Sequence, residues 1–244
     1  MTQLGEAFLP RAESILRQLD EAKFEIQEMA GTERGKLVIG AIPTIAPYFL
    51  PARLTSFAQK FPRVQISVVE EVTAELLNLM HRGAIDLALL ALPVNASHCI
   101  CHELFRARLY VVLPENHRLA GLSQVHLEQI KDDPFLLLKE GHCFRDNALS
   151  ACTRARLEPN VVFESGQFTT ILAMVAAGVG LSIVPEMAVD YRLSCRFIPL
   201  ADEGVDRRVG ILQLKRHFRS RVHRAFVEHL QTRKPTSKAL ARTA

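Results

Sequence analysis

The apolar residues near the start of the chain recur with a helical period. Two interleaved registers, each with a step of seven, contain Phe8, Ala12, Ile15, Leu19, Ala22, Ile26 and Met29. With charged positions around it, this stripe predicts one long amphipathic helix over 4–29 whose seam accepts a partner helix. Packing of the helix on its own domain is the alternative. Gly31 is expected to end the helix, so we assign 1–30 to dimerisation.

From residue 35 onwards, strand-length apolar runs alternate with helical segments. Strands are predicted at 36–41, 64–69, 86–91, 109–113, 135–138, 161–164, 181–184 and 209–214. Helices are predicted at 44–61, 74–82, 143–152, 169–177 and 220–231. Because the strands are apolar throughout, the pattern favours a buried, mostly parallel sheet and an α/β fold. Two such series predict two lobes, and the polar stretch 233–244 is expected to be a disordered tail.

Composition and charge narrow the class of protein. The 244 residues carry a net charge of +4 and include five cysteines. No apolar run approaches the ~20 residues of a membrane span and no secretory signal begins the chain, so we expect a cytoplasmic protein without membrane contact. Five unevenly spaced cysteines do not fit a secreted disulfide framework. Eleven Lys and Arg against two acids from 206 onwards could contact nucleic acid, although a solvated helix face is the commoner meaning.

The most informative stretch is 141–152, which reads GHCFRDNALSAC. A thiol at a helix start beside cationic side chains is expected to be more acidic than a free thiol, and the thiolate is the form that attacks peroxides. If the segment stays helical, Cys143 and Cys152 lie about 13 Å apart along the axis. A disulfide needs Cα atoms about 4.4–6.8 Å apart, so the pair can join only if the helix unwinds. Two ordinary buried cysteines are the alternative.

This stretch resembles the redox segment of the OxyR-type branch of LysR-type transcriptional regulators, which sense hydrogen peroxide. In that branch a peroxide-reactive cysteine follows Gly-His and a resolving cysteine lies nine residues later, which corresponds to Cys143 and Cys152 here. The wider family is indicated over 35–231 by Ile42-Pro43-Thr44, Gly83-x-x-Asp86 and the run 173–185 (AMVAAGVGLSIVP).

The resemblance implies a two-lobed, periplasmic-binding-protein-like α/β fold that follows a long N-terminal linker helix. Lobe I would comprise 34–107 and 209–232, and lobe II would comprise 108–208 with the redox segment at 141–152. The winged helix-turn-helix of the family would precede the linker over 1–30, and we expect it to be absent from this sequence.

The resemblance also implies a polar peroxide- or effector-binding pocket around Cys143, formed by Thr44, Thr73, His142, Asp146 and Arg208. Each member has a plainer alternative. Both threonines start predicted helices and could serve only as caps. His142 could lie at the surface, and Asp146 could form an exposed pair with Arg145. Arg207 precedes Arg208, which leaves the choice of arginine open by one residue.

The function implied is that of a sensor, not an enzyme, and it needs no metal or other cofactor. Peroxide would oxidise Cys143, Cys152 would close a disulfide, and a cytosolic thiol reductant would restore both thiols. The full-length regulator, a homodimer or homotetramer, would pass the signal to promoter DNA and RNA polymerase. The alternatives are a LysR-type domain that binds a small anionic metabolite, and a thiol peroxidase, against which the lack of a Cys-x-x-Cys motif argues.

The segment His98-Cys99-Ile100-Cys101-His102 places four metal-type ligands in five residues. In an extended segment the two cysteines share one face, so the four side chains cannot all bind one ion. Tetrahedral zinc sites bring two well-separated ligand pairs together. We therefore expect no metal site there. Cys195 lies in no motif and is expected in the core.

Overall fold

The computed structural model describes residues 35–202, 204, 206–215 and 219–232, and twelve scattered positions before residue 35. The predicted dimerisation helix and the tail at 233–244 therefore lie outside the ranges described continuously. The chain divides into two compact units: the first contains 1–90, 94–104 and 210–234, and the second contains 91–93, 105–209 and 235–244. The predicted lobe boundaries, which follow 107 and 208, stay a prediction.

The first unit is built on a parallel sheet. Strand β1 (Gly35–Ala41) pairs in parallel with β2 (Val64–Glu70) on one side and β3 (Leu87–Leu92) on the other. The start of β4 (Cys99–Pro114) and the end of β9 (Asp206–Leu214) extend the order to β2-β1-β3-β9-β4. All six side chains of β3 are buried, as expected for a central strand covered on both faces.

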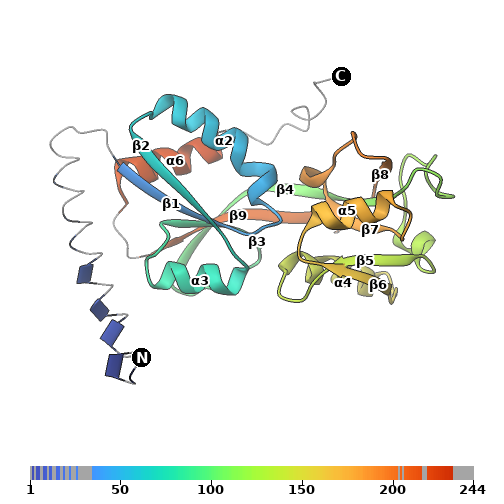
Figure 1. Ribbon diagram of the computed structural model, residues 1–244, viewed down its shortest axis with the longest axis horizontal. Coiled ribbons are helices and arrows are strands. Elements are labelled where there is room, and N and C mark those ends of the chain that lie inside the picture. Colours follow the sequence, from blue (N-terminus) through green and yellow to red (C-terminus); the bar gives the residue numbers. More distant parts are fainter. Residues whose placement is uncertain are drawn as a thin grey trace. The chain divides into compact units, whose positions relative to one another are not determined.

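Three helices cover this sheet. Helices α2 (Ala46–Lys60) and α6 (Arg221–Gln231) lie on one face, and α3 (Thr73–His81) lies on the other (Figure 1). Ser220 caps α6 by accepting a hydrogen bond from the His223 amide at 3.0 Å. On β1, a side chain at Gly40 would collide with the α3 side of the core, because its Cβ would lie 2.8 Å from Leu76 Cδ2. A larger residue at position 40 would therefore force the Ile85 and Leu76 side chains to move.

The second unit contains a parallel pair, β5 (Pro134–Leu138) and β6 (Asn160–Ser165), and an antiparallel group. In the latter, β4 pairs with both β7 (Ser182–Pro185) and β8 (Cys195–Pro199). The remaining elements are the helices α4 (Cys143–Arg154) and α5 (Phe168–Ala176), and the 3-10 turns η1 (Leu127–Ile130) and η2 (Glu186–Ala188).

The prediction of a mostly parallel sheet is right for β1 with its neighbours β2 and β3, and it is wrong for β4 with β7 and β8 in the second unit. The physical reason is that an apolar run indicates burial but carries no strand direction. Strand β4 also begins ten residues earlier than predicted, because its first half is polar and half exposed and so lacks an apolar run. None of the described helices is long and apolar enough to cross a membrane.

Candidate functional site

Cys143 is the first residue of α4, directly after the turn that leaves β5. Gly141 has φ +85°, a left-handed conformation that favours glycine, and this lets the chain turn from strand to helix. His142 is the N-cap residue in an extended conformation, and it makes no side-chain capping bond. The half-buried Cys143 thiol therefore lies at the positive end of a twelve-residue helix dipole.

A buried arginine contacts this thiol. Arg207 on β9 is only 1% exposed, and its Nη2 lies 3.6 Å from Cys143 Sγ. Its guanidinium carbon lies 4.9 Å from the centre of the Phe144 ring, which adds a cation–π contact. Burial lowers the pKa of Arg207, and the neighbouring Cys143 opposes this shift. The contact therefore places a buried guanidinium directly beside the sulfur of Cys143.

The contact with Cys143 thus comes from Arg207 and not from its neighbour Arg208. Along the start of β9 the side chains alternate, with Asp206 exposed, Arg207 buried and Arg208 half-buried. Successive side chains of a strand point to opposite faces, so the two arginines face opposite ways. A role for Arg208 in the site stays a prediction. The sequence does contain an indication for Arg207. It lies two positions before the apolar Val209, so the two side chains are expected on the same, buried face of the strand.

Phe144 and Arg145 hold the first turn of α4 against its surroundings in the second unit. The Phe144 ring packs edge-on against Phe168 of α5, with ring centres 5.0 Å apart. Arg145 donates a hydrogen bond to the Leu138 carbonyl at 2.9 Å and forms an ion pair with Glu164 of β6. The Arg145 side chain is 16% exposed and that of Glu164 is 41% exposed, so solvent reaches this ion pair from the glutamate side. The first turn of α4 is therefore tied to both β5 and β6.

His142 and Asp146 flank the thiol in sequence but differ in environment. Burial lowers the pKa of His142, which favours the neutral imidazole near pH 7. A Cβ on Gly166 would lie 3.8 Å from His142 Nε2, so the ring rests against the turn before α5. Asp146 is exposed, and the adjacent Arg145 forms its ion pair with Glu164. Roles for His142 and Asp146 at the thiol stay predictions.

Cys152 lies in the last turns of α4 and is 1% exposed. Burial raises the pKa of its thiol to about 11. Neither Cys152 nor Cys143 is in a disulfide. Since α4 is continuous from Cys143 to Arg154, the nine helical steps from Cys143 to Cys152 separate their Cα atoms by about 13 Å along the axis. The helix must therefore unwind before these sulfurs can bond.

Thr44 and Thr73 belong to the first unit, whereas Cys143 belongs to the second. Thr44 is 3% exposed and lies in the turn between β1 and α2; Thr73 is the first residue of α3. The N-cap residues are Ile45 and Val72, and neither helix has a side-chain cap, so the capping alternative does not describe these threonines. Both stand where a helix begins, at the carboxyl edge of neighbouring parallel strands.

Comparison with known proteins places these features in a family. Residues 30–235 match the LysR substrate binding domain. The chain is 31% identical to a probable hydrogen peroxide-inducible genes activator of Mycobacterium avium over 216 residues, which cover 87% of this chain and 70% of that protein.

Solved structures agree in fold. The reduced OxyR regulatory domain of Pseudomonas aeruginosa is 29% identical, with a TM-score of 0.74 over 82% of this chain and 98% of that one. A cysteine-to-serine mutant of Corynebacterium glutamicum OxyR with bound H2O2 is 31% identical, with a TM-score of 0.76 over 95% of this chain and 76% of that one. The α/β fold is therefore the periplasmic-binding-protein-like fold predicted, and the chain belongs to the LysR substrate-binding domain family, with OxyR proteins among its relatives.

Proposed function

We propose that this domain senses hydrogen peroxide through oxidation of Cys143. The observation that carries the proposal is the contact between Cys143 Sγ and the buried Arg207 guanidinium, 3.6 Å away, at the start of α4. The fixed positive group beside the sulfur can stabilise the negative charge that develops on the leaving oxygen when the O–O bond breaks.

The chemistry needs two thiols and one peroxide. The Cys143 thiolate attacks one oxygen of H2O2, the O–O bond breaks, and the second oxygen leaves as hydroxide, which takes up a proton to become water. Cys143 is then a sulfenic acid. The Cys152 thiol condenses with it, forming the S–S bond and releasing a second water. One peroxide is thus reduced by two electrons that both come from the thiol pair.

The helix that separates the two sulfurs becomes the switch. Cys152 is buried and, with a pKa of about 11, stays protonated at neutral pH, so it does not compete with Cys143 for peroxide. Condensation requires α4 to unwind, because its two ends stay about 13 Å apart while it is helical. An order-to-disorder change of this segment is the signal that we expect the regulator to transmit.

The relatives support this assignment and extend it to partners. The Mycobacterium avium relative is named as an activator of peroxide-inducible genes, and a Corynebacterium glutamicum relative binds H2O2. By analogy, the whole regulator would act on promoter DNA and RNA polymerase as a homodimer or homotetramer in the cytoplasm. A thiol reductant would return the disulfide to two thiols.

The test is a disulfide map of the anaerobically reduced protein after a pulse of half an equivalent of H2O2. We expect a bond between Cys143 and Cys152, no such bond in Cys143→Ser, and a trappable sulfenic acid in Cys152→Ser. Cys99→Ser is the matched control and should behave as wild type. Oxidation spread over all five cysteines, or a Cys143 that remains reduced, would overturn the proposal.

One observation favours a second candidate function, the binding of a small anionic metabolite. The hydroxyl of Thr73 is buried and has no hydrogen-bond partner among the described residues. Thr73 begins α3 at the same edge of the sheet as Thr44. Helix N-termini at such an edge can bind anions. If peroxide leaves Cys143 unchanged, thermal-shift screening of small carboxylates, with Thr73→Val as control, becomes the deciding experiment.

A further inference from the structure

The C-terminal end of α4 is closed by a pair of hydrogen bonds, one of which ends on Cys152. The Leu157 amide donates to the Cys152 carbonyl at 2.9 Å, and the Arg156 amide donates to the Thr153 carbonyl at 3.0 Å. This pattern is a Schellman motif, in which the residue after the cap takes a left-handed conformation. Arg156 occupies that position here, with φ +55°.

Arginine is an unfavourable residue for this position. Glycine is usual there, because in the left-handed conformation a side chain brings its Cβ close to the following carbonyl oxygen. Among the residues that the structure describes, no other non-glycine residue has a positive φ. The cap that ends α4 is therefore strained at Arg156, and unwinding of this end of the helix relieves the strain.

A hydrogen bond holds the same end of α4 in place. Arg154, the last residue of the helix, donates from Nη2 to the Gly204 carbonyl at 3.0 Å, in the segment between β8 and β9. A cationic side chain in the last turn also interacts favourably with the helix dipole. Burial raises the pKa of Cys152, and the Asp202 carboxylate from the same segment adds to this shift. This segment therefore lies close to the end of α4 that carries Cys152.

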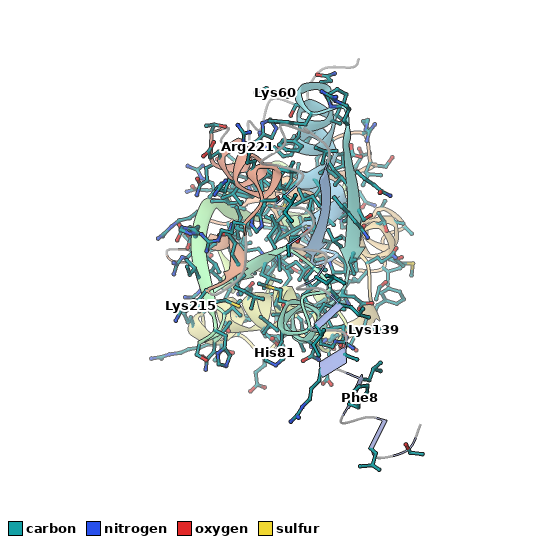
Figure 2. The ribbon with its side chains drawn as sticks, turned by 90° about the vertical axis from the view of Figure 1, so that its left-hand side faces the viewer. Phe8, Lys60, His81, Lys139, Lys215 and Arg221 are labelled. Carbon is teal, nitrogen blue, oxygen red and sulfur yellow. The ribbon has the colours of Figure 1, made fainter. Side chains whose placement is uncertain are left out.

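The N-terminal end of α4 is held by larger side chains. Phe144 is 1% exposed, and its ring contacts both Phe168 and the Arg207 guanidinium. The chain that leads into this end is also tied down. Lys139, labelled in Figure 2, directly follows β5, and its amide donates a hydrogen bond to the Ser165 carbonyl at 2.9 Å.

The C-terminal half of the helix buries only small side chains, namely Ala148, Ala151 and Cys152. The free energy of burial scales with the apolar surface that is removed from water, and a phenylalanine ring removes far more than a methyl group or a thiol. Withdrawal of the C-terminal end from the core therefore costs less than withdrawal of the N-terminal end.

We propose that α4 unwinds from its C-terminal end, with the strained cap at Arg156 promoting this opening and the Arg154–Gly204 bond opposing it. Both arginines are positioning residues that act through Cys152, and their effect on signalling rests on the proposed function. Cys143, as a sulfenic acid, stays at the fixed end of the helix, and Cys152 moves to it. The Cys152 sulfur attacks the sulfenic sulfur, the S–S bond forms, and the hydroxide that leaves takes up the thiol proton to become water.

The two arginines should therefore control the second step of the reaction and not the first. Disulfide closure requires the open helix, so its rate scales with the open fraction. Arg156→Gly removes the strain and should slow closure roughly 3–10-fold. Arg154→Gln removes the bond to Gly204 and should speed closure roughly 3–10-fold. The effects of the two variants have opposite signs, although each removes one positive charge.

The experiment is a single-turnover reaction of the reduced full chain with one equivalent of H2O2, quenched at increasing times. Mass spectrometry follows the sulfenic acid as its dimedone adduct and the Cys143–Cys152 disulfide. The first step is measured separately in the Cys152→Ser background, where its rate should stay unchanged in every variant. Arg156→Gln is the matched control, because it removes the charge but keeps the Cβ and its strain, and it should close at the wild-type rate.

Hydrogen exchange of the reduced protein provides a second measurement that needs no peroxide. Amides at 155–157 should exchange more slowly in Arg156→Gly and faster in Arg154→Gln, whereas amides at 147–149 should keep their rates. If no protein forms a sulfenic acid, the proposed function fails, and this exchange pattern still tests which end of α4 opens.

Three results would overturn the inference. The first is a change of the same sign in Arg156→Gly and Arg154→Gln, or no change in either closure or exchange. The second is an Arg156→Gln protein that closes as slowly as Arg156→Gly, which would assign the effect to charge. The third is a changed rate of the first step, which would mean that the arginines act on the Cys143 site. Circular dichroism of each variant checks that it is folded.

Discussion

The molecule contains two pairs of cysteines whose local structures differ in kind. Cys143 and Cys152 lie at opposite ends of a helix, about 13 Å apart along its axis, and Cys152 is buried. Cys99 and Cys101 share one face of a strand, about 6.7 Å apart, and Cys101 is exposed. The first pair is separated by secondary structure that can melt, whereas the second is held side by side by secondary structure that need not change.

The two environments also differ in the cation that accompanies them. Arg207 is buried and touches Cys143 Sγ, so its charge acts at a fixed point beside one sulfur. Lys215 follows β9 and lowers the pKa of Cys99 against the effect of burial. A fixed guanidinium is suited to orienting a reaction, and a flexible ammonium to balancing charge. We therefore expect the oxidative chemistry at the helix and not at the strand.

The largest expected difference between the pairs is in hydrogen exchange upon oxidation. A Cys143–Cys152 bond is incompatible with an intact α4, so amide exchange at 145–151 should speed up by roughly 100-fold or more. Amides at 99–103 should keep their rates. The measurement is hydrogen–deuterium exchange with mass spectrometry on reduced and peroxide-treated protein. A protected α4 in a protein that carries the disulfide would contradict the switch.

The next largest effect concerns the arginine beside Cys143. A hydrogen bond to a charged group contributes about 1.5–3 kcal/mol, so Arg207→Gln should slow oxidation of Cys143 roughly 10–100-fold. Stopped-flow mixing with H2O2, followed by thiol trapping, measures this rate. Arg208→Gln is the matched control because it removes the same charge one position along β9, and it should change the rate less than threefold. Equal effects of Arg207→Gln and Arg208→Gln would show that the contact between Arg207 and Cys143 does not set the oxidation rate.

A smaller effect concerns stability at alkaline pH. The folded protein holds the Cys152 proton up to a pKa of about 11, whereas the ordinary thiol value is 9.0. The stability contributed by this thiol is therefore fully present below pH 9 and is lost as the pH rises through 11. We expect about 1–2 kcal/mol of pH-dependent loss from this site.

Urea unfolding of wild type and Cys152→Ala at pH 8 and pH 10.5 tests this contribution. The difference in free energy of unfolding between wild type and Cys152→Ala should be smaller at pH 10.5, because only wild type loses the stability contributed by the protonated Cys152 thiol. A constant difference for Cys152→Ala would show that its burial is not linked to protonation.

The smallest effect concerns the tie between α4 and the β5–β6 pair. Arg145→Gln removes the ion pair with Glu164 and weakens the bond to the Leu138 carbonyl, and both support the helical, reduced form. A loss of about 1 kcal/mol in the reduced form corresponds to roughly 20 mV, and it makes the disulfide harder to reduce. Redox titration of the Cys143–Cys152 pair in glutathione buffers measures this. A shift in the opposite direction would mean that the tie supports the oxidised form.

Much of the fold was predictable because its signals are local. The alternation of apolar runs and amphipathic segments predicted α2 (Ala46–Lys60), α3 (Thr73–His81) and α6 (Arg221–Gln231) to within about two residues. Strand β8 (Cys195–Pro199) was not predicted, because five residues with a charged side chain among them carry too little periodicity. The antiparallel pairing of β4 depends on which strands lie next to it in the folded chain, and no local sequence pattern indicates those partners.

For the site, the sequence by itself determined the thiol at a helix start and the second cysteine nine residues later, since both lie within one contiguous segment whose geometry follows from the helix. It left the choice between Arg207 and Arg208 open, and tertiary structure decided it in favour of contact from Arg207. That contact joins residues 64 positions apart and depends on the exact register of β9, where a shift of one residue exchanges the two faces.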